Sequence, residues 1–210
     1  IDYFLVRIDN EKLVINTQLA YEKERALLLP FYIISAAIAL VAVLCYFFNW
    51  VYVDNTDYGI EVKVSGFSFV AAAIAGNYTS TQPIFGDLAV PFFYYAATEC
   101  QVLGILTIIA LIADIGAIAL LIVTRITKKQ QLSLIALPLT VISAVLLFVA
   151  FGIALGMKNG DILSVYCGGN PKCLIRSLAI IAAIVTLASA VLQGYTSVKY
   201  ILCVKKHAAK

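Results

Sequence analysis

Charged residues and histidine are scarce in this sequence, and their scarcity excludes several functions. Asp, Glu, Lys and Arg make up 13% of the 210 residues, against about 25% in soluble domains. The single histidine, His207, lies in a Lys-rich C-terminal segment, which excludes paired-histidine haem ligation and an H-E-x-x-H zinc site within this chain. The net charge of +3 and the short basic runs give no indication of nucleic-acid binding.

Recognised catalytic motifs are also absent. The sequence contains neither a Gly-x-Ser-x-Gly nucleophile elbow nor a Gly-rich phosphate-binding loop. Asp54 and Asp57 lie close together but in a predicted turn, without a partner base. We therefore expect a non-enzymatic protein with no cofactor and no metal site.

Long apolar stretches are what the sequence has in abundance. Apolar residues make up 62% of the chain, and a helix of about 20 such residues crosses a bilayer at 1.5 Å per residue. Asp114 is the one charge inside the four runs, which are Ala26–Val53, Val102–Thr124, Gln130–Met157 and Ser177–Val198. The sequence predicts an all-α membrane protein: a bundle of four transmembrane helices that contacts the lipid bilayer.

The distribution of Lys and Arg predicts how the chain is oriented. Cytoplasmic loops carry an excess of these residues, and here they gather before the first run, between the second and third, and after the fourth. The loop 54–101 instead holds Lys63 alone against five acidic residues. We expect both termini to be cytoplasmic and the protein to lie in the cell membrane. The predicted segments are a cytoplasmic segment 1–25, spans 26–53, 91–124, 132–157 and 177–198, outer loops 54–90 and 158–176, an inner loop 125–131 and a tail 199–210.

The first outer loop shows strand character. Ile60, Val62 and Val64 alternate with polar residues, a period of two that is typical of a strand. We expect a β-hairpin of 50–53 with 59–65, forming a small extracytoplasmic loop domain. Phe67–Ala75 is too short to span the membrane, and is a re-entrant segment, an interfacial helix or a buried strand. Asn77 begins an Asn-Tyr-Thr glycosylation motif, although such tripeptides are common by chance.

Two cysteines bracket a turn in the second outer loop. Cys167 and Cys173 are separated by Gly-Gly-Asn-Pro-Lys, and Gly and Pro make a tight return of the chain easy. An oxidising outer compartment would allow them to form a disulfide; the alternative is two free thiols. This spacing is not a recognised zinc-binding pattern.

Counting residues from the charged ends of the runs predicts a polar layer. A charged side chain at the centre of a membrane helix costs about 2.5–3.5 kcal/mol on insertion scales, so Asp114 should face protein or water. Asp114 lies eleven positions before Arg125, the basic residue at the inner end of its run. Counting eleven positions from the basic residue at the inner end of each other run leads to Thr140, to Ala36 beside Ser35 and to Ala188 beside Ser189. Gln193 shares a helix face with Ser189. We expect an intramembrane cluster of Ser35, Asp114, Thr140, Ser189 and Gln193, with Asp114 protonated.

Two interpretations of Asp114 remain. It is either a proton or cation site of a small transporter or channel subunit, or a contact that holds helices or subunits together through hydroxyl groups. A transport path usually carries several ionisable residues or broken helices, and this sequence shows one acid. The structural interpretation is favoured.

A pair of small residues predicts close helix packing in the third run. Gly152 and Gly156 form a GxxxG motif, which lets two helix backbones approach closely. The pair serves either packing within the bundle or association with another chain, and internal packing is the expected use.

The predicted topology resembles that of the claudin and peripheral-myelin type of membrane protein. The shared features are four helices, inner termini, a long first outer loop with strand character and a short second one. That family's first-loop signature, Gly-Leu-Trp followed by two cysteines, is absent: Trp50 alone does not carry it, and Cys100 has no loop partner.

The expected function follows from these features. We expect a non-catalytic accessory, scaffold or assembly subunit whose partners are other integral membrane proteins or further copies of itself. Transport through Asp114 is the alternative, and adhesion or a receptor-like role of the outer loop comes third.

Overall fold

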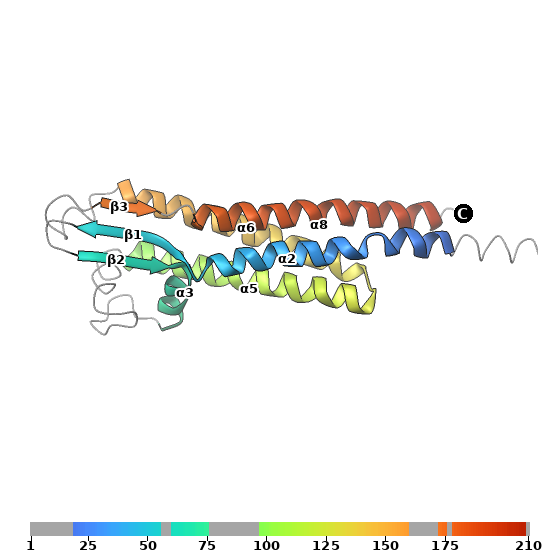
Figure 1. Ribbon diagram of the computed structural model, residues 1–210, viewed down its shortest axis with the longest axis horizontal. Coiled ribbons are helices and arrows are strands. Elements are labelled where there is room, and N and C mark those ends of the chain that lie inside the picture. The colour runs from blue at the N-terminus through green and yellow to red at the C-terminus, as the bar shows by residue number, and fades with distance from the viewer. Residues whose placement is uncertain (1–18, 56–59, 76–96, 160–171, 176–177, 209–210) are drawn as a thin grey trace, which may run out of the picture.

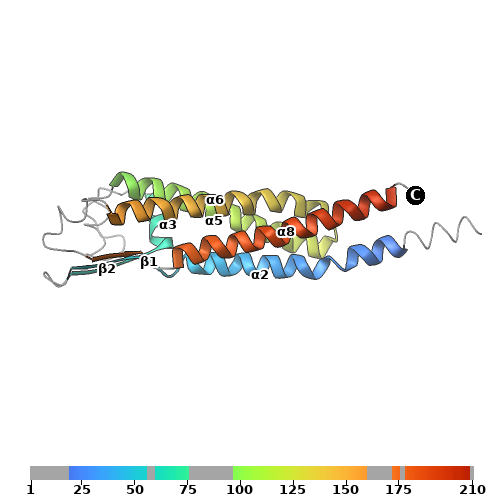
Figure 2. The same cartoon turned by 90° about the horizontal axis from the view of Figure 1, so that it is seen from above.

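Four long helices, each long and apolar enough to cross a membrane, form the body of the protein. The structure is a computed structural model and describes residues 19–55, 60–75, 97–159, 172–175 and 178–208. The long helices are α2 (Leu29–Cys45), α5 (Ala97–Thr127), α6 (Gln131–Asn159) and α8 (Leu178–Ala208). They run side by side along the long axis of the molecule (Figures 1 and 2), and each contacts two others in the order α2, α5, α6, α8.

The two ends of the bundle differ. One end, the sheet end, carries the strands and a short helix (Figure 1). The other, the turn end, comprises residues 19–28, the turn 128–130 between α5 and α6, and the C-terminal part of α8. Residues 19–26 are helical and lead into α2, so that the first apolar helical segment is Leu19–Cys45.

Alanine, serine and threonine predominate in the interior of the bundle, with a few large side chains such as Tyr32 and Leu121 among them, and large apolar side chains cover its surface. On α2 the buried positions are Tyr32, Ser35, Ala36, Ala39, Ala42 and Cys45, which recur three or four residues apart and therefore share one helix face. Large apolar side chains such as Ile34, Ile112 and Val191 are exposed instead. Small side chains on the faces that meet neighbouring helices allow the helix backbones to approach closely.

Two apolar clusters lie at different heights in the bundle. The sheet-end cluster includes Tyr46, Trp50, Val64, Phe69, Leu103, Ala110, Leu147 and Ala183. The turn-end cluster includes Leu28, Tyr32, Ala36, Ala117, Leu121, Ala136 and Tyr200. On α5, Ala110 belongs to the sheet-end cluster and Ala117 to the turn-end cluster, and Asp114 lies between these two residues. A polar layer therefore separates the two clusters.

A three-stranded antiparallel sheet stands at the sheet end. Strand β1 (Asn49–Asn55) pairs with β2 (Ile60–Ser65) on one side and with β3 (Lys172–Ile175) on the other. The β1–β2 pairing, with Val51 opposite Val64 and Val53 opposite Val62, confirms the predicted hairpin. Strand β3 was not predicted, because four residues are too few to show a period of two.

The segment after the hairpin is a helix. Of the three forms considered for it, the structure has helix α3 (Gly66–Ala75), which packs against α5. Ser65 caps its N-terminus, because the Ser68 backbone N–H donates to Ser65 Oγ at 3.1 Å. Phe69 and Val70 are buried in the sheet-end cluster.

The predicted first span, 26–53, extends too far at its C-terminal end. Helix α2 ends at Cys45, and residues from Asn49 onward belong to β1. Trp50 explains the termination: its indole Nε1 donates to the Cys45 carbonyl oxygen at 2.9 Å, so the side chain satisfies a carbonyl that a continuing helix would have used. The other predicted spans correspond to α5, α6 and α8, with α8 continuing well past Val198 to Ala208.

Trp50 also joins the sheet to the bundle. Its ring lies 5.0 Å from the ring of Tyr46 between centroids and directly over Gly66, where an added Cβ would overlap the indole atoms. The Phe67 N–H donates to the Tyr46 carbonyl oxygen at 2.7 Å. The junction therefore requires a glycine at position 66.

Replacing Gly66 with alanine should destabilise the protein. The new methyl group must displace the Trp50 ring, and overpacking of this kind costs about 1–3 kcal/mol. We expect a lower Tm in detergent, followed by circular dichroism. Gly194→Ala is the matched control, because a Cβ there meets no atom within 4 Å, and it should leave the Tm unchanged or slightly higher. Equal Tm values for the two variants would contradict the packing described at this junction.

Candidate functional site

The polar layer contains a hydrogen-bonded network that links three helices. Gln193 on α8 donates from Nε2 to Thr140 Oγ1 on α6 at 2.9 Å and to Ser189 Oγ at 3.0 Å. Ser189 Oγ donates in turn to the backbone oxygen of Ser35 on α2 at 2.9 Å. All four residues are fully buried. The structure thus brings together four of the five residues predicted for the intramembrane cluster.

Asp114, the fifth predicted residue, lies outside this network. It is fully buried, and neither carboxyl oxygen has a hydrogen-bond partner among the described residues. Ser143, one helical turn along α6 from Thr140, faces the carboxyl group without reaching hydrogen-bond geometry. The phenol of Tyr46 lies within electrostatic range of it.

Helix geometry explains why Tyr46 and Asp114 converge. A helical side chain leans toward the N-terminus of its own helix, and α2 and α5 run in opposite directions. Tyr46, at the C-terminal end of α2, therefore leans toward the turn end, and Asp114 leans toward the sheet end. The two side chains approach each other from different heights.

The Asp114 group has limited chemical options. An ionised carboxylate without a partner in such an environment would cost many kcal/mol. The group can hold a proton, and then donate to a neighbouring hydroxyl, or it can hold a small cation. Among the described residues, no cluster of three or more His, Cys, Asp or Glu side chains could bind a metal ion.

The turn end carries a second polar arrangement, which the sequence analysis missed. Arg25 donates from Nη2 to the Lys128 backbone oxygen at 2.8 Å, and Gln130 Nε2 donates to the Arg25 backbone oxygen at 2.8 Å. These two bonds tie the start of α2 to the α5–α6 turn. Lys128 adopts φ = 56°, a left-handed conformation that costs a non-glycine residue about 1–2 kcal/mol.

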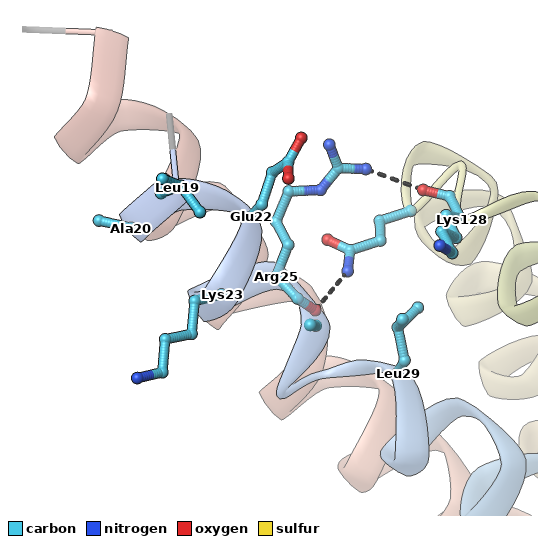
Figure 3. A pocket seen from close by; sticks show the side chains of 9 residues that line it. Leu19, Ala20, Glu22, Lys23, Arg25, Leu29 and Lys128 are labelled. Atoms are coloured by element: carbon cyan, nitrogen blue, oxygen red, sulfur yellow. Dashed lines mark hydrogen bonds between the residues drawn. The ribbon is translucent and has the colours of Figure 1, made fainter. Parts of the chain in front are cut away.

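A groove opens beside these residues (Figure 3). Its volume is about 630 Å³. Leu19, Ala20, Ala26 and Leu29 form its apolar lining, and Glu22, Lys23, Arg25, Lys128 and Gln130 form its polar lining. Figure 3 shows the Arg25 side chain directed toward Lys128 and the Lys23 side chain extending away from both.

The structure places Gly152 and Gly156 on the outside of the bundle. Both are exposed, and a Cβ added at either would meet no atom within 4 Å. The expectation that the pair serves packing within the bundle is therefore wrong for the described part of the chain. The rotation of a helix about its own axis is set by its neighbours, and α6 turns Ala144, Leu147 and Ala154 inward instead.

Several predicted site residues lie outside the part of the chain that can be examined. Asn77 and Cys167 are outside the described residues, as are residues 1–18 of the predicted cytoplasmic segment 1–25. Cys173 lies in β3, but its side chain is not described. The disulfide and the glycosylation site remain predictions.

Some of the site could have been found in the sequence and some could not. Ser143 follows Thr140 by three residues, so helical spacing alone would have placed it on the same face. Tyr46 gave no such signal, because its position depends on the folded junction around Trp50. Arg25 and Gln130 meet through backbone atoms of distant segments, which no sequence pattern marks.

Comparisons with protein-family models, with curated proteins and with solved structures find no match. The function proposed below therefore rests on the sequence and on the geometry of the described residues.

The hydrogen bond between Thr140 and Gln193 should contribute measurably to stability. Thr140→Val and Gln193→Leu each remove one partner, and a double-mutant cycle on the free energy of unfolding isolates their coupling. Polar pairs between membrane helices give about 0.6 kcal/mol on average and up to about 1.7 kcal/mol, and we expect a value in this range.

Thr107 supplies the control for this cycle. Its hydroxyl is also buried but bonds only to carbonyl oxygens of its own helix, at Leu103 and Gly104. The pair Thr107→Val and Gln193→Leu should therefore show no coupling. Absence of coupling between Thr140 and Gln193 in mild detergent or in bilayers would contradict the observed network.

Proposed function

We propose that this chain is a multi-pass integral membrane protein of the cell membrane. The exposed surface of the four long helices supports this, because it is rich in Leu, Ile, Val and Phe between the sheet end and the charged turn end. Soluble monomers rarely expose contiguous apolar patches of more than a few hundred Å². The small interior and large exterior side chains are what lipid-facing helices require.

We propose further that both termini face the cytoplasm. The turn end holds a concentration of positive charge, which the positive-inside rule assigns to the cytoplasmic face. The described basic residues near it are Lys23, Arg25, Arg125, Lys128, Lys129, Lys199, Lys205 and Lys206. The sheet then lies on the extracytoplasmic side.

The function that the geometry supports best is that of a non-catalytic accessory, scaffold or assembly subunit of a membrane complex. The observation that carries this proposal is the outward position of Gly152 and Gly156. Two glycines on a lipid-facing surface leave a notch into which another helix can pack with close backbone contact. On the same face of α6, the exposed Val145, Phe148 and Val149 flank that notch, so a partner helix would find both a gap and apolar side chains beside it.

Filling the notch should weaken association. Gly152→Leu and Gly156→Leu place bulky side chains where a partner backbone would lie, and the larger species on a native gel of a mild-detergent extract should shift toward the free protein. Ala188→Leu, at an exposed position of α8, is the control and should not shift it. If both changes leave the larger species unaltered, the notch is not the association surface.

One observation favours transport as the second candidate. Asp114 is buried and has no hydrogen-bond partner in the part of the chain that the structure describes, and an unpaired intramembrane acid is often part of an ion path. Our proposal assigns Asp114 a structural role as a neutral group among Ser143 and Tyr46. The neutral carboxyl group would then help to hold α5 against its neighbouring helices, and polar contacts between membrane helices contribute about 0.6 kcal/mol on average and up to about 1.7 kcal/mol.

Asp114→Leu separates the two candidates. On our proposal, liposomes containing the wild-type protein conduct protons and cations no faster than protein-free liposomes, and Asp114→Leu weakens assembly or lowers the Tm without changing conduction. Conduction by the wild-type protein that Asp114→Leu abolishes, with assembly unchanged, would contradict the proposal and establish transport.

A further inference from the structure

We propose that the groove at the turn end binds one anionic phospholipid whose headgroup carries hydroxyl groups. The groove is the one lined by Arg25, Lys128 and Gln130 described above. This inference rests on the proposed membrane embedding and names a specific lipid-binding site within it.

The position of the groove suits a lipid headgroup. It lies where the apolar parts of α2 and α5 give way to charged residues, so its lining combines apolar and charged side chains. Leu19 and Leu27 are exposed beside it. An acyl chain could therefore continue from the groove along the apolar helix surface while its headgroup stays beside the charged lining residues.

Positive charge predominates in the groove. Lys23, Arg25 and Lys128 line it against the single carboxylate of Glu22. Juxtamembrane basic residues attract anionic lipids with about 1 kcal/mol each, and basic pockets between helices at this level are suited to lipid phosphates. Complementary charge thus favours an anionic occupant over a zwitterionic one.

Arg25 is held in place for such a contact. Its guanidinium donates one bond to the Lys128 backbone oxygen and lies 5.2 Å from the centroid of the Tyr21 ring. A guanidinium has five N–H donors, so it retains donors for a phosphate after making that bond. Its fixed position lowers the entropy lost on binding.

Lys128 supplies the second charge. It lines the groove together with Arg25, and no described residue forms an ion pair with it.

Gln130 provides an acceptor that the protein does not use. Its Nε2 is bonded to Arg25, but its Oε1 is buried and has no partner among the described residues. A buried amide oxygen without a donor is unfavourable by about 1–3 kcal/mol. A headgroup hydroxyl near the phosphate would supply that donor, which distinguishes a polyol headgroup from choline.

The test examines membrane embedding and lipid binding in the groove in two separate steps. The full-length protein is first incorporated into phosphatidylcholine vesicles, and flotation with resistance to alkaline extraction establishes embedding without any anionic lipid. Failure at this step contradicts the proposed function. Binding of phosphatidylglycerol and of phosphatidylcholine to the detergent-solubilised protein is then measured by native mass spectrometry.

Lys128→Gln and Lys129→Gln form a matched pair of variants for the binding measurement. Both remove one positive charge at neighbouring positions, but only Lys128 lines the groove, and its backbone oxygen remains to accept the bond from Arg25. We expect Lys128→Gln to weaken the affinity for phosphatidylglycerol about fivefold and Lys129→Gln to change it less than twofold. Glu22→Gln, which removes the one negative charge, should strengthen it.

Three results would overturn the proposal. Equal affinities of the wild-type protein for the two lipids would mean that the groove does not select an anionic headgroup. Equal losses in Lys128→Gln and Lys129→Gln would indicate unspecific attraction to the basic surface. Displacement of phosphatidylglycerol by millimolar glycerol 3-phosphate would assign the site to a free phosphate compound and not to a lipid.

Discussion

The close approach of helix backbones through small side chains is the constraint on which the rest of this structure depends. Ser189 Oγ on α8 reaches a backbone oxygen of α2 at Ser35, and a serine side chain is too short to do so unless the two helices nearly touch. Ala36 and Ala39 on α2 and Ala182, Ala183 and Ala190 on α8 are all buried. Larger side chains at these positions would separate the helices and break the contact.

The same constraint explains the division of the interior into layers. Where helices approach closely, little room remains for large apolar groups, and hydroxyl and amide groups can reach their partners on neighbouring helices. The Thr140–Gln193–Ser189 network occupies this middle region, with an apolar cluster on either side. The network joins α2, α6 and α8, so a shift of any of these three helices along its axis would leave buried polar groups without partners.

Different contacts connect the elements at the two ends of the bundle. At the sheet end, Trp50 closes α2 and packs over Gly66, which fixes where the sheet begins. At the turn end, Arg25, Lys128 and Gln130 connect the first helix to the α5–α6 turn. Glu24 and Lys206 form an ion pair between the first helix and α8, at 2.6 Å, but both side chains are exposed, so the pair contributes little to stability.

Much of the fold could be predicted from the sequence, because its main features depend on composition and on fixed local geometry. Helices of the required length follow from the apolar runs, and the alternation Ile60–Val62–Val64 indicates the hairpin. The constant rise of a helix allowed residues such as Ser35, Thr140 and Ser189 to be placed at one depth by counting. These inferences use only local spacing.

The rest depends on tertiary contacts that local spacing does not contain. Strand β3 forms because it pairs with β1. Helix α2 ends earlier than predicted because the Trp50 indole N–H donates to the carbonyl oxygen of Cys45, the last residue of the helix. The outward rotation of Gly152 and Gly156 is decided by which face of α6 meets α5 and α8. For the same reason, sequence could place Asp114 inside the bundle but could not show that it lies outside the hydrogen-bonded network, next to Ser143 and Tyr46.

The central claim is that large apolar side chains face lipid while small and polar ones face each other. Spin labels attached to single cysteines in phosphatidylcholine bilayers, with the native cysteines replaced by alanine, test it on α5. A label at Ile112, which is exposed, should collide often with oxygen and rarely with a water-soluble nickel chelate, and a label at the buried Ala117 should collide rarely with both. Frequent collision of the Ile112 label with the nickel chelate would contradict the account, because that helix face would then lie in water.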